Sequence, residues 1–172
     1  TMTDWEKCVE FHGHACGGLT IGYQAARYAR SLLGLTRSPD EQVVCIAEND
    51  ACGVDAIQVM LGCSVGKGNL ILRVMGKQAF SFYERASGRS VRLVLRRAPE
   101  GMTKEESFRY YQEHEPEELF DVKPAVLPVP ERARIYRTLT CEGCGESVGE
   151  AWVRLRDGKC LCLACAGSGS ES

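Results

Sequence analysis

The chain has 172 residues, 44% of them hydrophobic, and its 21 Lys and Arg against 23 Asp and Glu give a net charge of -2. This length suits one core domain plus a small appendage, and the charge balance excludes a general attraction to nucleic acid or anionic lipid. Because no apolar run reaches the roughly 18 residues of a membrane span and no signal-peptide pattern opens the chain, we expect a cytoplasmic protein without a membrane partner.

The first half of the chain predicts helices that follow loops rich in glycine or polar residues. Apolar residues at helical spacing predict helices over 4–11, 19–33 and 54–61, and a continuous apolar run predicts a buried strand over 42–47. Thr20 is the expected cap of the second helix, and Gly34 its stop. The loops that carry His12 to Gly18 and Glu48 to Gly53 therefore lead into helices.

The second half begins with strands and ends in a cysteine-rich segment. Strands are predicted over 70–74, 79–83 and 90–97, with Ser87-Gly88 as a hairpin turn. Thr103 and Glu106 form a capping-box pattern that opens a helix to about residue 114. Three prolines between 121 and 130 indicate an extended linker. We therefore expect a core domain over 1–122, a linker over 123–135, a zinc-ribbon domain over 136–167 and a disordered tail over 168–172.

The last third of the chain carries a strong metal-binding pattern. Two pairs of cysteines with two-residue gaps, separated by 17 residues, predict one structural zinc ion held by Cys141, Cys144, Cys162 and Cys165. Ten cysteines without an export signal favour metal or redox chemistry over disulfides. Six basic and six acidic residues over 131–172 argue against nucleic acid as the partner of this ribbon.

A second candidate site lies in the core. His12, His14 and Cys16 alternate in a glycine-flanked loop, so extended backbone would place them on one side as a partial ligand set for a transition metal, with zinc among the candidates. The start of the following helix favours a thiolate at Cys16. Cys52 precedes another helix and offers a further ligand, as does Cys63 in its glycine-rich loop.

Each candidate also has a purely structural interpretation. Cys8 and Cys45 are expected to pack in the core, and Cys63 and His12 either pack or brace the site or bind the metal. Asp50 is a candidate for proton transfer with Cys16 and Cys52 as catalytic thiols. Asp55 either moves protons or serves the helix dipole.

Several ordered motifs resemble the FmdE family, which takes its name from a component of formylmethanofuran dehydrogenase. The resemblance rests on residues 11–19 (FHGHACGGL), 50–58 (DACGVDAIQ), 62–70 (GCSVGKGNL) and 76–80 (GKQAF), together with the trailing ribbon. It departs at Gly17, where the family usually has proline. The resemblance implies an α+β core in which His14, Cys16 and Cys52 form a metal-binding or active-site pocket, with Cys63 close by, and it implies a homodimer. We therefore expect a mixed sheet with flanking helices, followed by the small zinc ribbon.

Three functions follow as hypotheses. The first is an accessory or metal-handling protein related to the FmdE component, with molybdenum or tungsten oxidoreductase subunits as partners, a core Cys/His metal and a separate structural zinc. The second is an enzyme in its own right, either metal-dependent with an open coordination position or a thiol-redox enzyme using Cys16 and Cys52. The third is a ribbon-based protein-interaction module without chemistry.

Overall fold

The chain forms two compact units. The structure, a computed structural model, describes residues 1–37, 42–128, 131 and 135–167. One unit spans Thr1–Arg132 and the other Ala133–Ser172. Part of the predicted linker and all of the predicted disordered tail lie outside the described residues.

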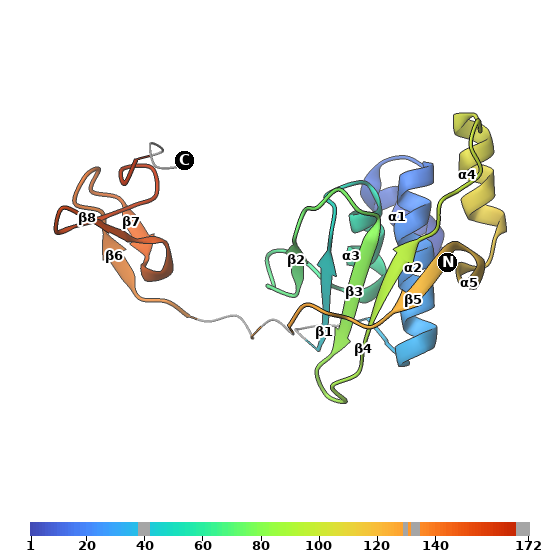
Figure 1. Ribbon diagram of the computed structural model, residues 1–172, viewed down its shortest axis with the longest axis horizontal. Helices are drawn as coiled ribbons and strands as arrows, with labels where there is room; N and C mark the ends of the chain where they lie inside the picture. The colour runs from blue at the N-terminus through green and yellow to red at the C-terminus, as the bar shows by residue number, and fades with distance from the viewer. Residues whose placement is uncertain (38–41, 129–130, 132–134, 168–172) are drawn as a thin grey trace. The chain divides into compact units, whose positions relative to one another are not determined.

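The first unit is built on a five-stranded mixed sheet (Figure 1). Its strand order is β2-β1-β3-β4-β5. β1 and β2 are parallel, and the remaining neighbours are antiparallel. This arrangement confirms the predicted α+β class with a mixed sheet. The strands are β1 (Val43–Ala47), β2 (Leu70–Leu72), β3 (Ala79–Glu84), β4 (Ser90–Leu95) and β5 (Phe120–Lys123).

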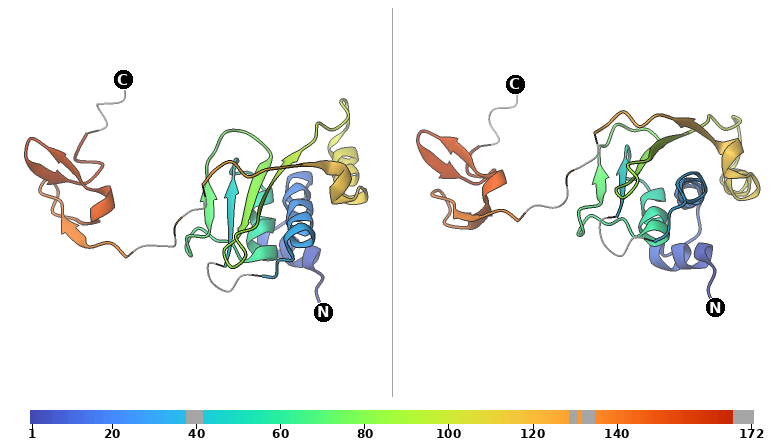
Figure 2. Two further views of the ribbon diagram at one scale, coloured as in Figure 1. Left: turned by 60° about the horizontal axis from the view of Figure 1, so that its bottom comes forward. Right: turned by 90° about the horizontal axis from the view of Figure 1, so that it is seen from below.

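Helices cover one face of this sheet, as Figure 2 shows from below. Alternate residues of β1, including Cys45 and Ala47, pack with the buried sides of the helices in the main hydrophobic core. The described helices are too short or too polar to cross a membrane. They are α1 (Asp4–His12), α2 (Gly17–Leu33), α3 (Gly53–Leu61), α4 (Lys104–Glu113) and α5 (Pro116–Leu119).

The opposite face of the sheet is covered by the chain that follows β5. Val44, Ile46 and Tyr83 are buried there, with Ala125 and Leu127 packed against them. The Tyr83 hydroxyl donates a hydrogen bond to the Leu127 carbonyl at 2.6 Å. Part of the stretch predicted as an extended linker therefore belongs to the core unit.

β5 was not predicted as a strand, because it is short and leads into the proline-rich stretch. It pairs with β4 from Phe120 to Lys123, and the Phe120 side chain is buried. Asp121 also accepts a hydrogen bond from the Arg96 guanidinium at 2.8 Å. Burial of one aromatic ring and the ladder with β4 thus outweigh the weak strand signal of the sequence.

The start of α2 differs from its prediction in a way that matters for the site. The helix begins at Gly17, and its cap is Cys16, whose sulfur accepts a hydrogen bond from the Leu19 amide at 3.3 Å. Thr20 lies inside the helix, where it is buried and donates to the Cys16 carbonyl at 2.9 Å. The thiol of Cys16 therefore takes the capping position that the sequence suggested for the Thr20 hydroxyl.

The second unit consists of two short hairpins. β6 (Thr138–Thr140) pairs with β7 (Ser147–Gly149), and after the 3-10 helix η1 (Glu150–Trp152), β8 (Arg154–Arg156) pairs with β9 (Lys159–Leu161). The turn of the second hairpin has positive φ at both Asp157 (50°) and Gly158 (76°). Positive φ at both central residues is the geometry that a tight two-residue hairpin requires.

Candidate functional site

Two helices of the core meet through glycine at the point where the candidate site forms. A Cβ added to Gly22 of α2 would lie 1.9 Å from the carbonyl oxygen of Gly53, the first residue of α3. One turn earlier, a Cβ on Gly18 would lie 3.1 Å from the Cys52 Cβ. Because glycine lets the two backbones touch, the starts of α2 and α3 lie side by side.

This contact brings Cys16 and Cys52 together with His12. Their ligand atoms, two sulfurs and one ring nitrogen, all lie within 4.8 Å of one another. Cys16 Sγ is 3.8 Å from His12 Nε2. His12 is the last residue of α1, and Gly13 follows it in left-handed conformation, so the predicted extended alternation of His12, His14 and Cys16 does not occur. His12 reaches Cys16 from the end of a helix instead.

A carboxylate on α3 orients the His12 ring. Asp55 Oδ2 lies 2.7 Å from His12 Nδ1, and the His12 side chain is 12% exposed. With the proton on Nδ1 donated to Asp55, the lone pair of Nε2 is available beside the thiols. A carboxylate on the outer nitrogen of a histidine is the usual arrangement behind a metal-ligating imidazole. Asp55 was predicted either to move protons or to interact with the helix dipole, so its contact with His12 was not anticipated.

The two thiols share a partly buried environment at helix starts. Burial raises the pKa of the Cys52 thiol, and the nearby Cys16 thiol raises it further. Cys52 immediately precedes α3, and its side chain makes no capping hydrogen bond to that helix. The Cys52 sulfur is thus held close to Cys16 without being committed to the helix end.

Through Cys16 the cluster borders an open cavity of about 730 Å³, which lies between helix α4 and the loop that precedes α2. The buried side chain of Gln24 holds α4 in place by donating to the carbonyls of Tyr111 at 2.8 Å and His114 at 3.1 Å. The lining residues on α4 recur at helical spacing and so form one stripe. The wall on the loop side is His14, Ala15, Cys16 and Gly17, and the wall on α4 is Lys104, Glu105, Phe108, Arg109, Gln112 and Glu113.

Three of the predicted core residues lie outside the described His12/Cys16/Cys52 cluster. His14 is exposed, with its ring centroid 4.7 Å from that of His12, and it lines the cavity. Cys63 is buried, donates to the Val43 carbonyl at 3.5 Å, and burial raises its pKa to about 12. Asp50 is exposed in the loop after β1. Cys8 and Cys45 are buried in the core.

Some features of this site could not be anticipated from the sequence. The stripe of α4 that faces Cys16 lies some 90 residues further along the chain, and the only hint in the sequence was Phe108 on a polar helix. The contact between Gly22 and Gly53 was also missed. A glycine in a predicted helix indicates that another backbone can approach closely, but it does not indicate which segment of the chain that is.

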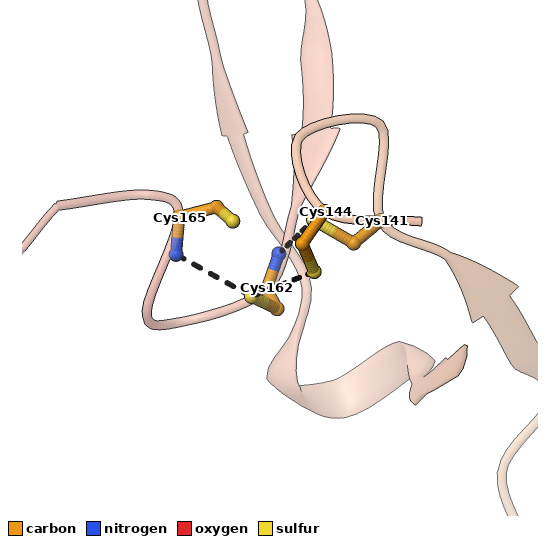
Figure 3. A group of neighbouring side chains, drawn as sticks. All are labelled: Cys141, Cys144, Cys162 and Cys165. Atoms are coloured by element: carbon orange, nitrogen blue, oxygen red, sulfur yellow. Dashed lines mark hydrogen bonds between the residues drawn. The ribbon is translucent and has the colours of Figure 1, made fainter. Parts of the chain in front are cut away.

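The second unit brings the four predicted cysteines together (Figure 3). The sulfurs of Cys141, Cys144, Cys162 and Cys165 all lie within 4.8 Å of one another, and those of Cys144 and Cys162 are 4.0 Å apart. In Figure 3 they converge from two turns of the chain. Cys160, which belongs to β9, pairs with Leu155 in the strand ladder and is not part of this group.

Backbone amides point at the sulfurs of this cluster. The Cys162 amide donates to Cys141 Sγ at 3.2 Å and the Gly143 amide does so at 3.3 Å, and amide donors lower the pKa of Cys141 to about 6. The neighbouring thiols raise the pKa of Cys165 to about 12. A Cβ on Gly143 would lie 3.0 Å from Cys165 Sγ, so glycine there allows the two turns to close.

Both clusters fit a metal ion. A tetrahedral ion with bonds of about 2.3 Å to sulfur separates its ligand atoms by about 3.8 Å. The Cys16 Sγ–His12 Nε2 distance of 3.8 Å and the Cys144 Sγ–Cys162 Sγ distance of 4.0 Å are close to this spacing, and the other ligand atoms of each group lie within 4.8 Å of one another. Four thiols close a coordination sphere, whereas the core group supplies three ligands and leaves a position toward further ligands.

The fold and these two clusters define a metal-binding protein: a mixed-sheet core with a Cys/His group at adjoining helix starts, joined to a small four-cysteine unit. The chain belongs to the family described as FmdE, Molybdenum formylmethanofuran dehydrogenase operon, whose model matches residues 11–135. This match confirms the resemblance found in the sequence motifs.

Two relatives are similar over most of this chain. A crystal structure of a tungsten formylmethanofuran dehydrogenase FmdE-like protein from Syntrophus aciditrophicus is 25% identical, with a TM-score of 0.69, and the match covers 97% of this chain and 92% of that one. A probable S-adenosyl-L-methionine-binding protein from Archaeoglobus fulgidus is 29% identical over 194 residues, covering 94% of this chain. The chain spans about half (52%) of the length of that curated relative.

Proposed function

We propose that this protein is a metal-handling accessory protein related to the FmdE component of molybdenum or tungsten formylmethanofuran dehydrogenase. The observation that carries the proposal is the His12/Cys16/Cys52 group, with Asp55 behind the imidazole and one coordination position left over. In this proposal the core group holds a transition metal, with zinc as the first candidate, and the four cysteines of the second unit hold a structural zinc.

The residues of the core have distinct tasks in this proposal. Cys16 and Cys52 supply sulfur ligands from the starts of α2 and α3, and coordination to an ion would favour their thiolate form. His12 supplies a neutral nitrogen, which Asp55 keeps in the correct tautomer. A metal bound there would either supply Lewis-acid chemistry beside the adjoining cavity or be held as cargo for transfer.

The test is metal analysis of the freshly purified chain. We expect about two metal ions per chain in the wild type, about one in Cys16→Ser, and a similar loss of the other ion in Cys144→Ser. Equal metal content in the wild type and Cys16→Ser would confine metal to the second unit and overturn the core site. In that case a Cys16–Cys52 disulfide formed under mild oxidant would support the thiol-redox alternative, since the two sulfurs lie within 4.8 Å.

A second candidate function is binding of S-adenosyl-L-methionine in the cavity beside Cys16. Two observations favour it: the name of the Archaeoglobus relative, and a cavity whose walls carry Phe108, two cations and the carboxylates Glu105 and Glu113. Such walls would suit a ligand with an aromatic base, a carboxylate and a sulfonium.

Equilibrium dialysis of the metal-loaded chain with S-adenosyl-L-methionine tests this second function. We expect one saturable site that Phe108→Ala weakens about tenfold, while Phe11→Ala, an exposed phenylalanine outside this cavity, leaves it unchanged. Absence of saturable binding at millimolar ligand would remove this function and leave the metal proposal intact.

A further inference from the structure

A second cavity, whose described lining includes no residue of the His12/Cys16/Cys52 group, gathers cationic side chains from different parts of the core unit. It has a volume of about 420 Å³ and is bounded by α1, α2, the end of α3 and the loop 62–69. Its described lining includes four cations and one carboxylate, in a chain whose net charge is -2. The cations are Lys7, Arg30, Arg37 and Lys67, and the carboxylate is Asp4.

The carboxylate in this cavity is already engaged. Asp4 Oδ2 accepts from the Arg30 guanidinium at 2.9 Å. Arg30 also donates to the Met60 carbonyl at 2.6 Å, so it covers the carbonyl end of α3 that would otherwise repel an anion. Together with Arg30, the side chains of Lys7, Arg37 and Lys67 place four cations in the described lining of one concave site, and such a site attracts negative ligands.

The loop that carries Lys67 is held in one conformation. Asn69 is fully buried and donates to the carbonyls of Val43 at 3.0 Å and Gly62 at 3.3 Å, while its oxygen accepts from the Ser64 amide at 2.9 Å. The Ser64 hydroxyl in turn accepts from the Lys67 amide. Ser64 and Lys67 are thus presented to the cavity by a braced loop rather than by a loose one.

We propose that this cavity binds the phosphate group of a small phosphorylated molecule. Lysine and arginine together with a hydroxyl are the side chains that recognise phosphate oxygens, and here they come from separate elements that the fold brings to one place. The volume admits a mononucleotide-sized ligand and excludes a bulky one. The site does not rest on the core metal, because none of its lining residues belongs to the His12/Cys16/Cys52 group.

Phe11 adds a preference within this ligand class. Its side chain is 57% exposed at the wall of the cavity. An exposed aromatic ring beside phosphate-binding cations favours a ligand with a flat ring, since bases stack on aromatic side chains. A nucleoside monophosphate is therefore expected to bind more tightly than inorganic phosphate.

Isothermal titration calorimetry of the full chain with pyrophosphate, AMP and inorganic phosphate tests the proposal. We expect one saturable site per chain, weakened about tenfold or more by Lys67→Ala and by Arg37→Ala. Lys77→Ala is the matched control, since Lys77 also stands beside a glycine in a loop but does not line the cavity. Phe11→Ala should lower the affinity for AMP and leave that for pyrophosphate unchanged.

Several results would overturn the site. Absence of saturable binding at millimolar pyrophosphate and AMP would do so, as would equal weakening by Lys67→Ala and Lys77→Ala, or binding of a single-stranded oligonucleotide without binding of either small anion. Repeating the titration with Cys16→Ser separates the two proposals, because this variant should keep phosphate binding even though it loses the core metal. Unchanged melting temperatures of the variants show that the fold is retained.

Discussion

At the scale of single residues, the core site depends on a side chain that does not itself reach the sulfurs. The Asp55 carboxylate contacts Nδ1 of His12 at 2.7 Å. This carboxylate fixes the ring orientation and the tautomer of His12, so that the lone pair of Nε2 faces the two sulfurs. This is a positioning role, and it predicts a loss of affinity rather than a loss of fold.

Asp55→Asn should weaken binding of the core metal by about 10–100-fold, because the amide does not stabilise the required tautomer as a carboxylate does. Competition with a chromophoric chelator measures this affinity. Asp50→Asn is the matched control, since Asp50 is an exposed carboxylate outside the described cluster. If both variants bind metal like the wild type, Asp55 is merely a helix-start carboxylate.

The residue scale also shows which parts of the sites could be predicted from the sequence. The four cysteines of the second unit are recognisable because both pairs are local and their spacing fixes their geometry. His12 and Cys52 converge only through docking of helices, which no local pattern specifies. Cys63 sits in an equally suggestive glycine-rich loop, yet its side chain points into the apolar core beside the Val43 carbonyl.

At the scale of elements, the crossing of α2 over α3 decides whether the site exists. The helices meet without side chains at Gly22 and Gly53. The sequence predicted both helices within a few residues, but α2 begins earlier than expected because Cys16 caps it. The capping box at Thr103 and Glu106 was predicted and is present. Local signals thus identify the elements, whereas the close approach between them depends on tertiary packing.

Gly22→Ala should destabilise the core unit by about 1–3 kcal/mol or more, since its Cβ would lie 1.9 Å from a backbone oxygen that cannot move aside alone. Core metal should be lost in parallel. Intrinsic helix propensity acts in the opposite direction, because it favours alanine over glycine by about 1 kcal/mol. The sign of the change in the free energy of unfolding therefore tells whether the backbone contact or the helix propensity dominates.

Urea denaturation and metal content measure both effects of this substitution. Gly17→Ala provides the comparison, because a Cβ there meets its nearest neighbour at an ordinary 3.8 Å. We expect this variant to keep both its stability and its core metal. Stabilisation by Gly22→Ala would show that the two helices are not held by backbone contact.

At the scale of the whole molecule, the two units differ in what keeps them folded. The first unit has a continuous apolar core between helices and sheet. In the second unit the strands have three residues each. Among the residues of this unit that the structure describes, Cys141 is the only buried hydrophobic one. We therefore expect a unit of this size without an apolar core to depend on a bound metal ion for its fold. The homodimer implied by the family resemblance stays a prediction.

A chelator should therefore unfold one unit and spare the other. With excess EDTA, the amide signals of residues 136–167 in a proton–nitrogen NMR spectrum should collapse to the unfolded range. Those of β1, β3 and α2 should keep their dispersion, since apolar burial holds them. Cys144→Ser should reproduce this spectrum without chelator. Persistence of the dispersed signals of the second unit would show that its fold is independent of metal.

The glycine contact between α2 and α3 has a consequence for the life of the protein in the cell. Cys16 and Cys52 stand immediately before two helices that come together only when the core is folded, so the unfolded chain has no equivalent site. An ion that binds only the folded form adds stability by mass action, about 2.7 kcal/mol at a hundred times its dissociation constant. Chains that acquire the ion would then escape proteolysis longer than chains that do not, and cellular abundance of the protein would follow metal supply without any change in its synthesis.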